Sequence, residues 1–326
     1  MIGILSVLLI AGSSVPLAQD SASMSAGRLC ERALDNAAPI GRPQLAAALQ
    51  MAEAGRQGAR TAFLRGCQRF AEGKAGKATD EFERAVKQEG ANPVYHLWLA
   101  RALGEQAQDA NPLRQPGLAR RTKSELERAS ALAPAYLDAR DGLVEFYLQA
   151  PGIVGGSVSK ARAQAAEMKR IDPYRGELAA LKVAQRSNDT GAVIRGYETL
   201  IESFPDSAGP YSALAVTYAA RRQWADGWRT IDRWSGRTPD SYAARYAAGR
   251  MAAESGQRPD QGEKALREYL SHELKPGEPS LAAAHWRLGM ILEKRGDRDG
   301  ARREYELGQK LDPALKGPRD GLGRLK

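Results

Sequence analysis

The sequence predicts an all-α protein made of stacked, antiparallel helix pairs, and three observations support this. Apolar residues recur at three- and four-residue intervals, most clearly over residues 281–293, which gives a helix one apolar face. Pro205 and Pro239 lie 34 residues apart, so a helix-ending signal returns at a fixed interval. Alanine is prominent, aromatic residues make up only 6% of the chain, and no long stretch alternates apolar with polar residues as a strand would.

The N-terminal 18 residues differ from the rest because they carry no charge, and Ile2–Ala11 is apolar. This run suits a signal peptide better than a membrane span, which needs about 20 apolar residues. We expect cleavage near Ala18, a periplasmic or secreted protein, and no stable membrane span in the mature chain. The alternative is an uncleaved anchor or a misassigned start, because no Lys or Arg precedes the run and Pro16 occupies a small-residue position.

After the signal peptide, residues 19–58 are predicted to form an N-terminal helical cap, residues 59–313 the repeats, and residues 314–326 a basic tail. The repeats should comprise about seven helix pairs. Only two cysteines, Cys30 and Cys67, are present. In an exported protein they could form a disulfide tying the helix at 27–34 to the first repeat helix. The alternative is two buried thiols.

The best-kept repeat unit spans residues 282–313. Its signature residues, in order, are Leu288, Gly289, Gly296, Ala301, Tyr305 and Pro313. We expect Gly289 to let a neighbouring backbone come close and Tyr305 to fill the gap beside Ala301. Proline at 313 ends the second helix, because it cannot donate the next backbone hydrogen bond.

This unit resembles a tetratricopeptide repeat, with His285 where the family usually has Trp and Leu292 where it has Tyr. The resemblance covers roughly residues 60–313, with 176–205 the weakest unit. It implies a right-handed α-solenoid, the tetratricopeptide superhelix, whose concave face is built from the first helix of each pair. Such a face binds peptides or proteins in this family.

Insertions interrupt the array near residues 104–117, 148–160 and 271–279. In the second, Pro151, Gly152, Gly155 and Gly156 oppose helix formation. The Ala-Pro and Gly-Gly pairs of this insertion resemble those of uncharacterised, exported bacterial tetratricopeptide proteins. A glycine-rich loop that opens a helix could hold phosphate, but the segment lacks G-x-x-x-x-G-K-[ST]. A structural turn is the favoured interpretation.

The sequence offers little chemistry for catalysis. His96, His272 and His285 form no H-E-x-x-H motif, and no serine lies within G-x-S-x-G. Acidic residues at Asp138, Asp141 and Glu145 share a helix face, as exposed helix acids commonly do. Two cysteines are too few for a metal site. We therefore expect no enzyme activity, no cofactor and no bound metal.

The net charge of +9 is the main argument for an acidic partner. Most cations alternate with Asp and Glu, as on solvated helix faces, so we expect no specific nucleic-acid binding. The denser cationic clusters are Arg114, Arg120, Arg121 and Lys123, and in the tail Lys316, Arg319, Arg324 and Lys326. A binder of an acidic or glycan polymer is therefore the alternative to a protein-binding function.

The family's groove-facing positions, carried onto the last three repeats, give seven candidate partner-binding residues. They are Ser212, Val216, Tyr246, Arg250, Trp286, Met290 and Glu293. An aromatic side chain beside an arginine suits recognition of an extended peptide. The alternative is that Trp286 and Tyr246 fill space between repeats, as Trp224, Trp228 and Trp234 are expected to do between helices. The resulting hypothesis is a non-enzymatic adaptor or scaffold in the bacterial cell envelope.

Overall fold

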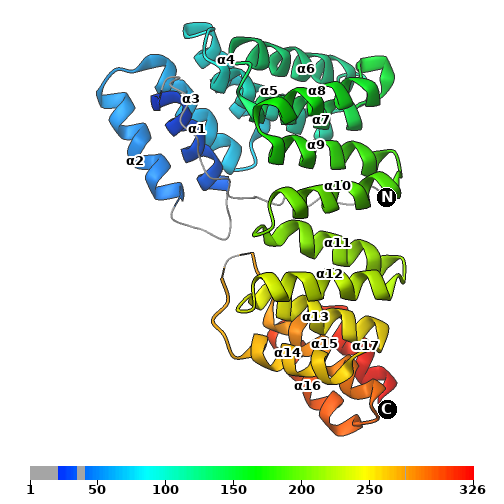
Figure 1. Cartoon of the computed structure of the whole chain (residues 1–326). Coiled ribbons are helices and arrows are strands. Elements are labelled where there is room, and N and C mark those ends of the chain that lie inside the picture. Colours follow the sequence, from blue (N-terminus) through cyan, green and yellow to red (C-terminus); the bar gives the residue numbers. More distant parts are fainter. Residues whose placement is uncertain (1–20, 35–40, 276) are drawn as a thin grey trace. The chain divides into compact units, whose positions relative to one another are not determined.

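The computed structural model describes residues 21–34, 41–275 and 277–326, which are helical and contain no strand (Figure 1). The predicted signal peptide lies outside these residues. The described part divides into two compact units. The first holds α1 (Ser21–Leu34), α2 (Gly41–Ala54), α3 (Gly58–Ala71), α4 (Ala75–Gln88), α5 (Pro93–Asp109), α6 (Gln115–Leu132), most of α7 (Leu137–Gln149) and the 3₁₀ turn η1 (Gly152–Val154).

The second unit begins with the last residues of α7. It continues with α8 (Val158–Ile171), α9 (Pro173–Arg186), α10 (Thr190–Ser203), α11 (Ala208–Ala220), α12 (Trp224–Arg237), α13 (Tyr242–Ser255), α14 (Pro259–Leu270), α15 (Leu281–Lys294), α16 (Arg298–Leu311) and α17 (Lys316–Arg324). From α3 to α16, the described helices follow one another along the chain as seven helix–turn–helix units. The fold is therefore the all-α helical repeat that the apolar periodicity predicts.

An aromatic cluster forms the centre of the first unit. The Phe63 ring stacks on Tyr95 at 4.7 Å between centroids and meets Trp98 edge-on at 6.4 Å. A Cβ at Gly66 would lie 2.5 Å from the Phe82 ring, so only glycine lets α4 pack this closely on α3. Because each ring contacts others from neighbouring helices, α3, α4 and α5 share one buried core.

Helix α1 joins this core by packing and by a covalent bond. It begins at Ser21, earlier than the predicted helix, and contacts α2, α3 and α5. Cys30 and Cys67 form a disulfide between α1 and α3, with Cα atoms 5.2 Å apart. Both cysteines are buried, and the disulfide alternative holds, whereas the alternative of two buried thiols is wrong. A disulfide that closes a long loop stabilises the fold mainly by restricting the unfolded chain.

In the helix pairs of the second unit, a glycine of one helix likewise packs against a large side chain of the other. Gly249 of α13 faces Leu266 of α14 in close contact, and Gly289 of α15 faces Tyr305 of α16. A Cβ at Gly289 would lie 2.6 Å from the Tyr305 ring. The expectation that Gly289 admits a neighbouring backbone is therefore wrong: it admits an aromatic side chain. Trp228 and Trp234 are buried in the cores, as expected of packing residues.

The basic tail at 314–326 forms helix α17, which packs against α15 and α16. Gly317 lies directly against the Trp286 indole, and a Cβ at Gly321 would lie 2.5 Å from the Tyr305 ring. Arg324 binds both carboxylate oxygens of Glu293, at 2.8 and 2.9 Å. The last helix of the stack thus covers apolar surface that a further repeat would otherwise bury.

The three predicted insertions have different structures. Helix α5 continues to Asp109, so only residues 110–114 of the first are irregular. In the second, no α-helix forms between Gln149 and Val158, as the glycine and proline residues predict, and Gly152–Val154 form one 3₁₀ turn before Gly155 at φ +108°. In the third, the Glu278 carboxylate accepts the Lys275 N–H at 2.8 Å.

Candidate functional site

Helices α11, α13 and α15 are the first helices of three successive pairs in the second unit, and they contact one another in that order. We call the side chains they present together the first-helix face. Candidate residues Ser212 and Val216 lie on α11, Tyr246 and Arg250 on α13, and Trp286, Met290 and Glu293 on α15. The face therefore contains all seven residues proposed from the sequence, although they do not form one site.

The centre of this face is an ion-pair cluster between α13 and α15. The Nε of Arg250 donates to Oε1 of Glu254 at 2.9 Å, and Nη2 of Arg287 approaches the same oxygen at 3.1 Å. We call Arg250, Glu254 and Arg287 the arginine cluster. Two guanidinium groups share one carboxylate, which leaves the cluster with an excess positive charge.

Arg287 is the most unusual member because it is a buried cation. Its side chain is only 12% exposed, and its Nε has no hydrogen-bond partner among the described residues. Burial lowers the pKa of Arg287 from its usual range, and the nearby charge of Arg250 also lowers it, although Glu254 opposes the shift. Burying a cation with incomplete hydrogen bonding costs folding free energy, so such groups are commonly retained for binding.

Two of the predicted residues surround the arginine cluster. Nη1 of Arg287 lies 3.5 Å from the sulfur of Met290, and Tyr246 contacts Arg287. The Tyr246 ring lies 5.1 Å from that of Tyr269, so it also fills space between α13 and α14. The surroundings of the cluster are thus apolar and polarisable, which suits an aromatic or aliphatic partner side chain.

Ser212 and Val216 lie one helix away from the cluster. Both are exposed on α11, where Val216 is 37% exposed, and neither has a described polar contact with it. Ser212 and Val216 therefore extend the first-helix face onto α11, where it is exposed to solvent.

Trp286 and Glu293 are the two predicted residues that also contact α17 and are only partly exposed. Gly317 of α17 lies against the indole, and Glu293 accepts hydrogen bonds from Arg324 and, at 2.5 Å, from the Tyr305 hydroxyl. The hydrogen bond from Arg324 is the main reason the pKa of Glu293 is lowered, and Tyr305 adds to it. The contact of Trp286 with α17 agrees with the alternative interpretation, in which this side chain fills space between helices. Its other contact, 3.9 Å from the Arg287 guanidinium to the ring, belongs to the cluster.

Sequence reasoning missed Arg287 and Glu254. Glu254 lies four residues after Arg250 on the same helix, a spacing that predicts an ion pair and could have been found. Arg287 could not have been found this way, because it follows Trp286 directly and its burial depends on the contact of α15 with α13. The pairing of Arg250 with Glu254 is thus specified within one helix, whereas the position of Arg287 depends on tertiary packing.

The three histidines are structural. Nδ1 of His96 lies 2.5 Å from a Glu125 oxygen and Nε2 lies 3.0 Å from the Gly90 carbonyl, so both nitrogens face acceptors. Burial opposes the charged form, but these two acceptors leave the pKa of His96 raised. His285 pairs with Glu304 in a similar way, at 2.6 Å. His96 and His285 are thus held between helices, and His272 is held in the loop after α14 by the Tyr269 carbonyl and Glu278.

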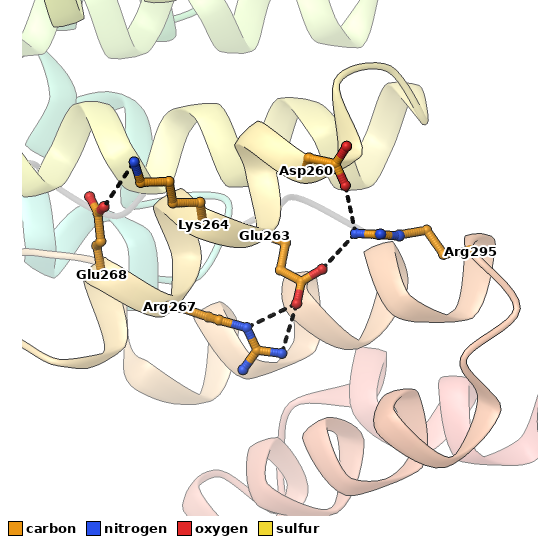
Figure 2. Close-up of a pocket in the computed structure, with 6 residues that line it drawn as sticks. All are labelled: Asp260, Glu263, Lys264, Arg267, Glu268 and Arg295. Carbon is orange, nitrogen blue, oxygen red and sulfur yellow. Dashed lines mark hydrogen bonds and ion pairs between the residues drawn. The ribbon is translucent and has the colours of Figure 1, made fainter.

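A second charged region lies on α14 and the end of α15 (Figure 2). This charged hollow, about 370 Å³ in volume, is lined by Asp260, Glu263, Lys264, Arg267, Glu268 and Arg295. Arg295 contacts Asp260 at 2.9 Å and Glu263 at 2.7 Å, and Glu263 also pairs with Arg267. Three cations and three carboxylates neutralise one another, so the hollow offers no net charge to a ligand.

The described residues contain no group of three or more His, Cys, Asp or Glu that could hold a metal ion. Within the same residues, no helix has both the length and the apolar character needed to cross a bilayer.

The sequence matches no protein-family model and no curated protein. Solved structures are similar in fold. A tetratricopeptide repeat protein from Parabacteroides merdae aligns with a TM-score of 0.50 and 11% identity, over 82% of this chain and 99% of that chain. Yeast Tom70 aligns with a TM-score of 0.53 and 14% identity, over 82% of this chain and 56% of that one. The chain therefore matches only about half of Tom70.

These alignments, together with the repeated helix pairs, show that the chain has the tetratricopeptide-repeat fold. At such low identities the likeness is one of fold alone, so function has to be argued from this chain's own residues.

Proposed function

We propose that the protein is a non-enzymatic interaction adaptor or scaffold that binds a peptide or protein segment on its first-helix face. The observation that carries this proposal is the arginine cluster: a buried arginine with an unpaired Nε, beside a second arginine that shares its only carboxylate. An acidic side chain of a partner would pair with the excess positive charge of the cluster at Arg250, whose side chain is 34% exposed, and Tyr246 and Met290 would contact apolar atoms beside it.

An adaptor agrees better than an enzyme with the arrangement of reactive groups. The three histidines are paired with carboxylates, two of them between helices and His272 within a loop, and the charged hollow holds paired ions. A general base needs access to a substrate proton, which these buried histidine pairs do not provide. The extended first-helix face instead resembles the binding surfaces that stacked repeats form.

We further propose that the protein acts in the bacterial cell envelope. Two observations support export: the uncharged, apolar N-terminal run and the Cys30–Cys67 disulfide, because disulfides persist in oxidising compartments. Cell fractionation combined with thiol trapping tests this. The expected result is an oxidised, shortened chain in the periplasm or medium. A full-length, reduced chain in the cytosol would contradict it.

Affinity capture from envelope extracts tests the binding proposal. The double variant Arg250→Gln, Arg287→Gln should capture at least about tenfold less of the partner than the wild type does, since interface arginines are frequent hot spots. Arg267→Gln, Arg295→Gln is the matched control, because it removes the same number of cations from the charged hollow of the same unit. Equal loss in both variants, or capture of the same abundant proteins by all three, would refute the proposal.

Binding of an acidic or glycan polymer is the second candidate, based on the net charge of +9. Many cations are already paired, including Arg121 with Glu83 and Arg324 with Glu293. A polymer bound through charge would dissociate steeply as salt rises, whereas a partner held on the first-helix face should remain bound at high salt. Salt washes during the same capture distinguish the two.

A further inference from the structure

Two large apolar side chains in the first unit are almost fully exposed. Leu113, in the turn between α5 and α6, is 93% exposed, and Ile153, in η1, is 85% exposed. Each lies in an insertion that the repeat itself does not require. Scattered apolar residues are normal on surfaces, but exposure this complete at the tips of two insertions requires a reason.

Both turns are built by defined contacts. In the first, the Asn111 side chain accepts the Arg114 N–H at 3.1 Å, and the Gln115 amide donates to the Ala110 carbonyl at 2.9 Å. In the second, Val154 is buried and its N–H donates to the Pro151 carbonyl at 3.0 Å. The neighbouring apolar side chains point to solvent because these turns hold them there.

The segment that leads into α6 and forms its first turns is positively charged. Residues 110–123 contain Arg114, Arg120, Arg121 and Lys123 and no acidic residue. Arg121 pairs with Glu83, whereas Arg114, Arg120 and Lys123 have no ion pair with a described residue. Glu105 and Asp109, at the end of α5, offset part of this charge.

One contact joins the second turn to these cations. A Cβ at Gly155 would lie 3.3 Å from the side chain of Lys123, so the η1 turn packs against Lys123 of α6. Ile153 thus lies in a turn that packs beside Lys123 of α6, and Leu113 lies in the turn that leads into the same helix. We call Leu113, Ile153, Arg114, Arg120 and Lys123 the α6 edge.

We propose that the α6 edge binds the surface of an anionic lipid bilayer, with Leu113 and Ile153 entering the headgroup region and Arg114, Arg120 and Lys123 contacting lipid phosphates. Cations near an anionic leaflet are attracted to it, and apolar side chains gain from shallow insertion. A soluble polyanion would use the cations alone. A folded protein would need a pocket for each tip, whereas a bilayer accepts both at any spacing.

Vesicle co-sedimentation tests this, with phosphatidylcholine vesicles compared with vesicles that also contain phosphatidylglycerol. The full chain should sediment more with the anionic vesicles. Leu113→Ser, Ile153→Ser should weaken that binding at least about tenfold, and Arg114→Gln, Arg120→Gln about twentyfold. The apolar run at residues 2–11 is the same in every variant, and the comparison is repeated on the chain from Gln19.

Leu307→Ser and Arg303→Gln are the matched controls, since both residues are exposed on α16 in the other unit, and both should bind vesicles as the wild type does. Circular dichroism checks that each variant is folded. The proposal is refuted if Leu113→Ser, Ile153→Ser binds anionic vesicles like the wild type. It is also refuted if heparin binds the chain more tightly than anionic vesicles do and only the arginine variant is impaired. Arg250→Gln, Arg287→Gln should bind vesicles normally, which separates this proposal from the first-helix face.

Discussion

The arginine cluster and the charged hollow are two ionic regions of the same unit, yet they differ in burial and balance. In each, one glutamate serves two arginines: Glu254 binds Arg250 and Arg287, and Glu263 binds Arg267 and Arg295. The hollow is solvent-exposed and adds further carboxylates, whereas Arg287 is buried with one carboxylate oxygen shared. The comparison teaches that the number of ion pairs does not identify a binding surface; burial and unbalanced charge do.

The largest expected effect on stability comes from removing Glu254, the carboxylate that Arg250 and Arg287 share. Glu254→Gln should destabilise the second unit by about 2–3 kcal/mol, because it leaves a buried guanidinium without a counter-ion beside a second cation. Urea denaturation followed by circular dichroism measures the change in the free energy of unfolding. A loss within the error of the measurement would show that Arg287 is better solvated than its burial indicates.

A smaller effect should follow from Glu293 of α15. The pKa of Glu293 is lowered, chiefly by Arg324, so the stability it provides is complete above the ordinary pKa of about 4.5 and is lost as the pH falls through the lowered value. The wild type should therefore lose this contribution to the free energy of unfolding on acidification. Glu293→Gln should lack that part of the acid sensitivity, measured as unfolding free energy between neutral and acidic pH. Identical acid sensitivity in the two proteins would contradict the assignment.

The smallest effect is expected in the charged hollow. Glu263→Gln, the counterpart of Glu254→Gln, should change the free energy of unfolding by no more than about 0.5 kcal/mol, because exposed ion pairs are screened by water and salt. The same denaturation experiment at low and high salt measures it. A cost equal to that of Glu254→Gln would remove the distinction between the two regions.

Local sequence signals predicted much of the fold. Proline and glycine spacing indicated the repeat at 282–313, since Gly289, Ala301 and Tyr305 act within one helix pair. The docking of α17 could not be read from the sequence, because Gly317 contacts Trp286 from a different helix. For that reason the repeat register could not show that Trp286 and Glu293 also contact α17.

The candidate site was predictable to the extent that it follows the repeat register. Tyr246, Arg250 and Met290 lie beside Arg287 because groove positions recur once per repeat. The buried state of Arg287 and its sharing of Glu254 depend on how α13 packs on α15, which no spacing within one helix specifies.

Site-specific photo-cross-linking tests the central claim most directly. A photo-reactive phenylalanine derivative replaces Val216 on the first-helix face, or Leu307 on α16, which is 44% exposed and serves as the control position. In living cells, position 216 should give a discrete adduct with a partner protein, the adduct should disappear with Arg250→Gln, Arg287→Gln, and position 307 should give none. Equal adducts from both positions, or an adduct at 216 that survives loss of both arginines, would contradict binding at the first-helix face.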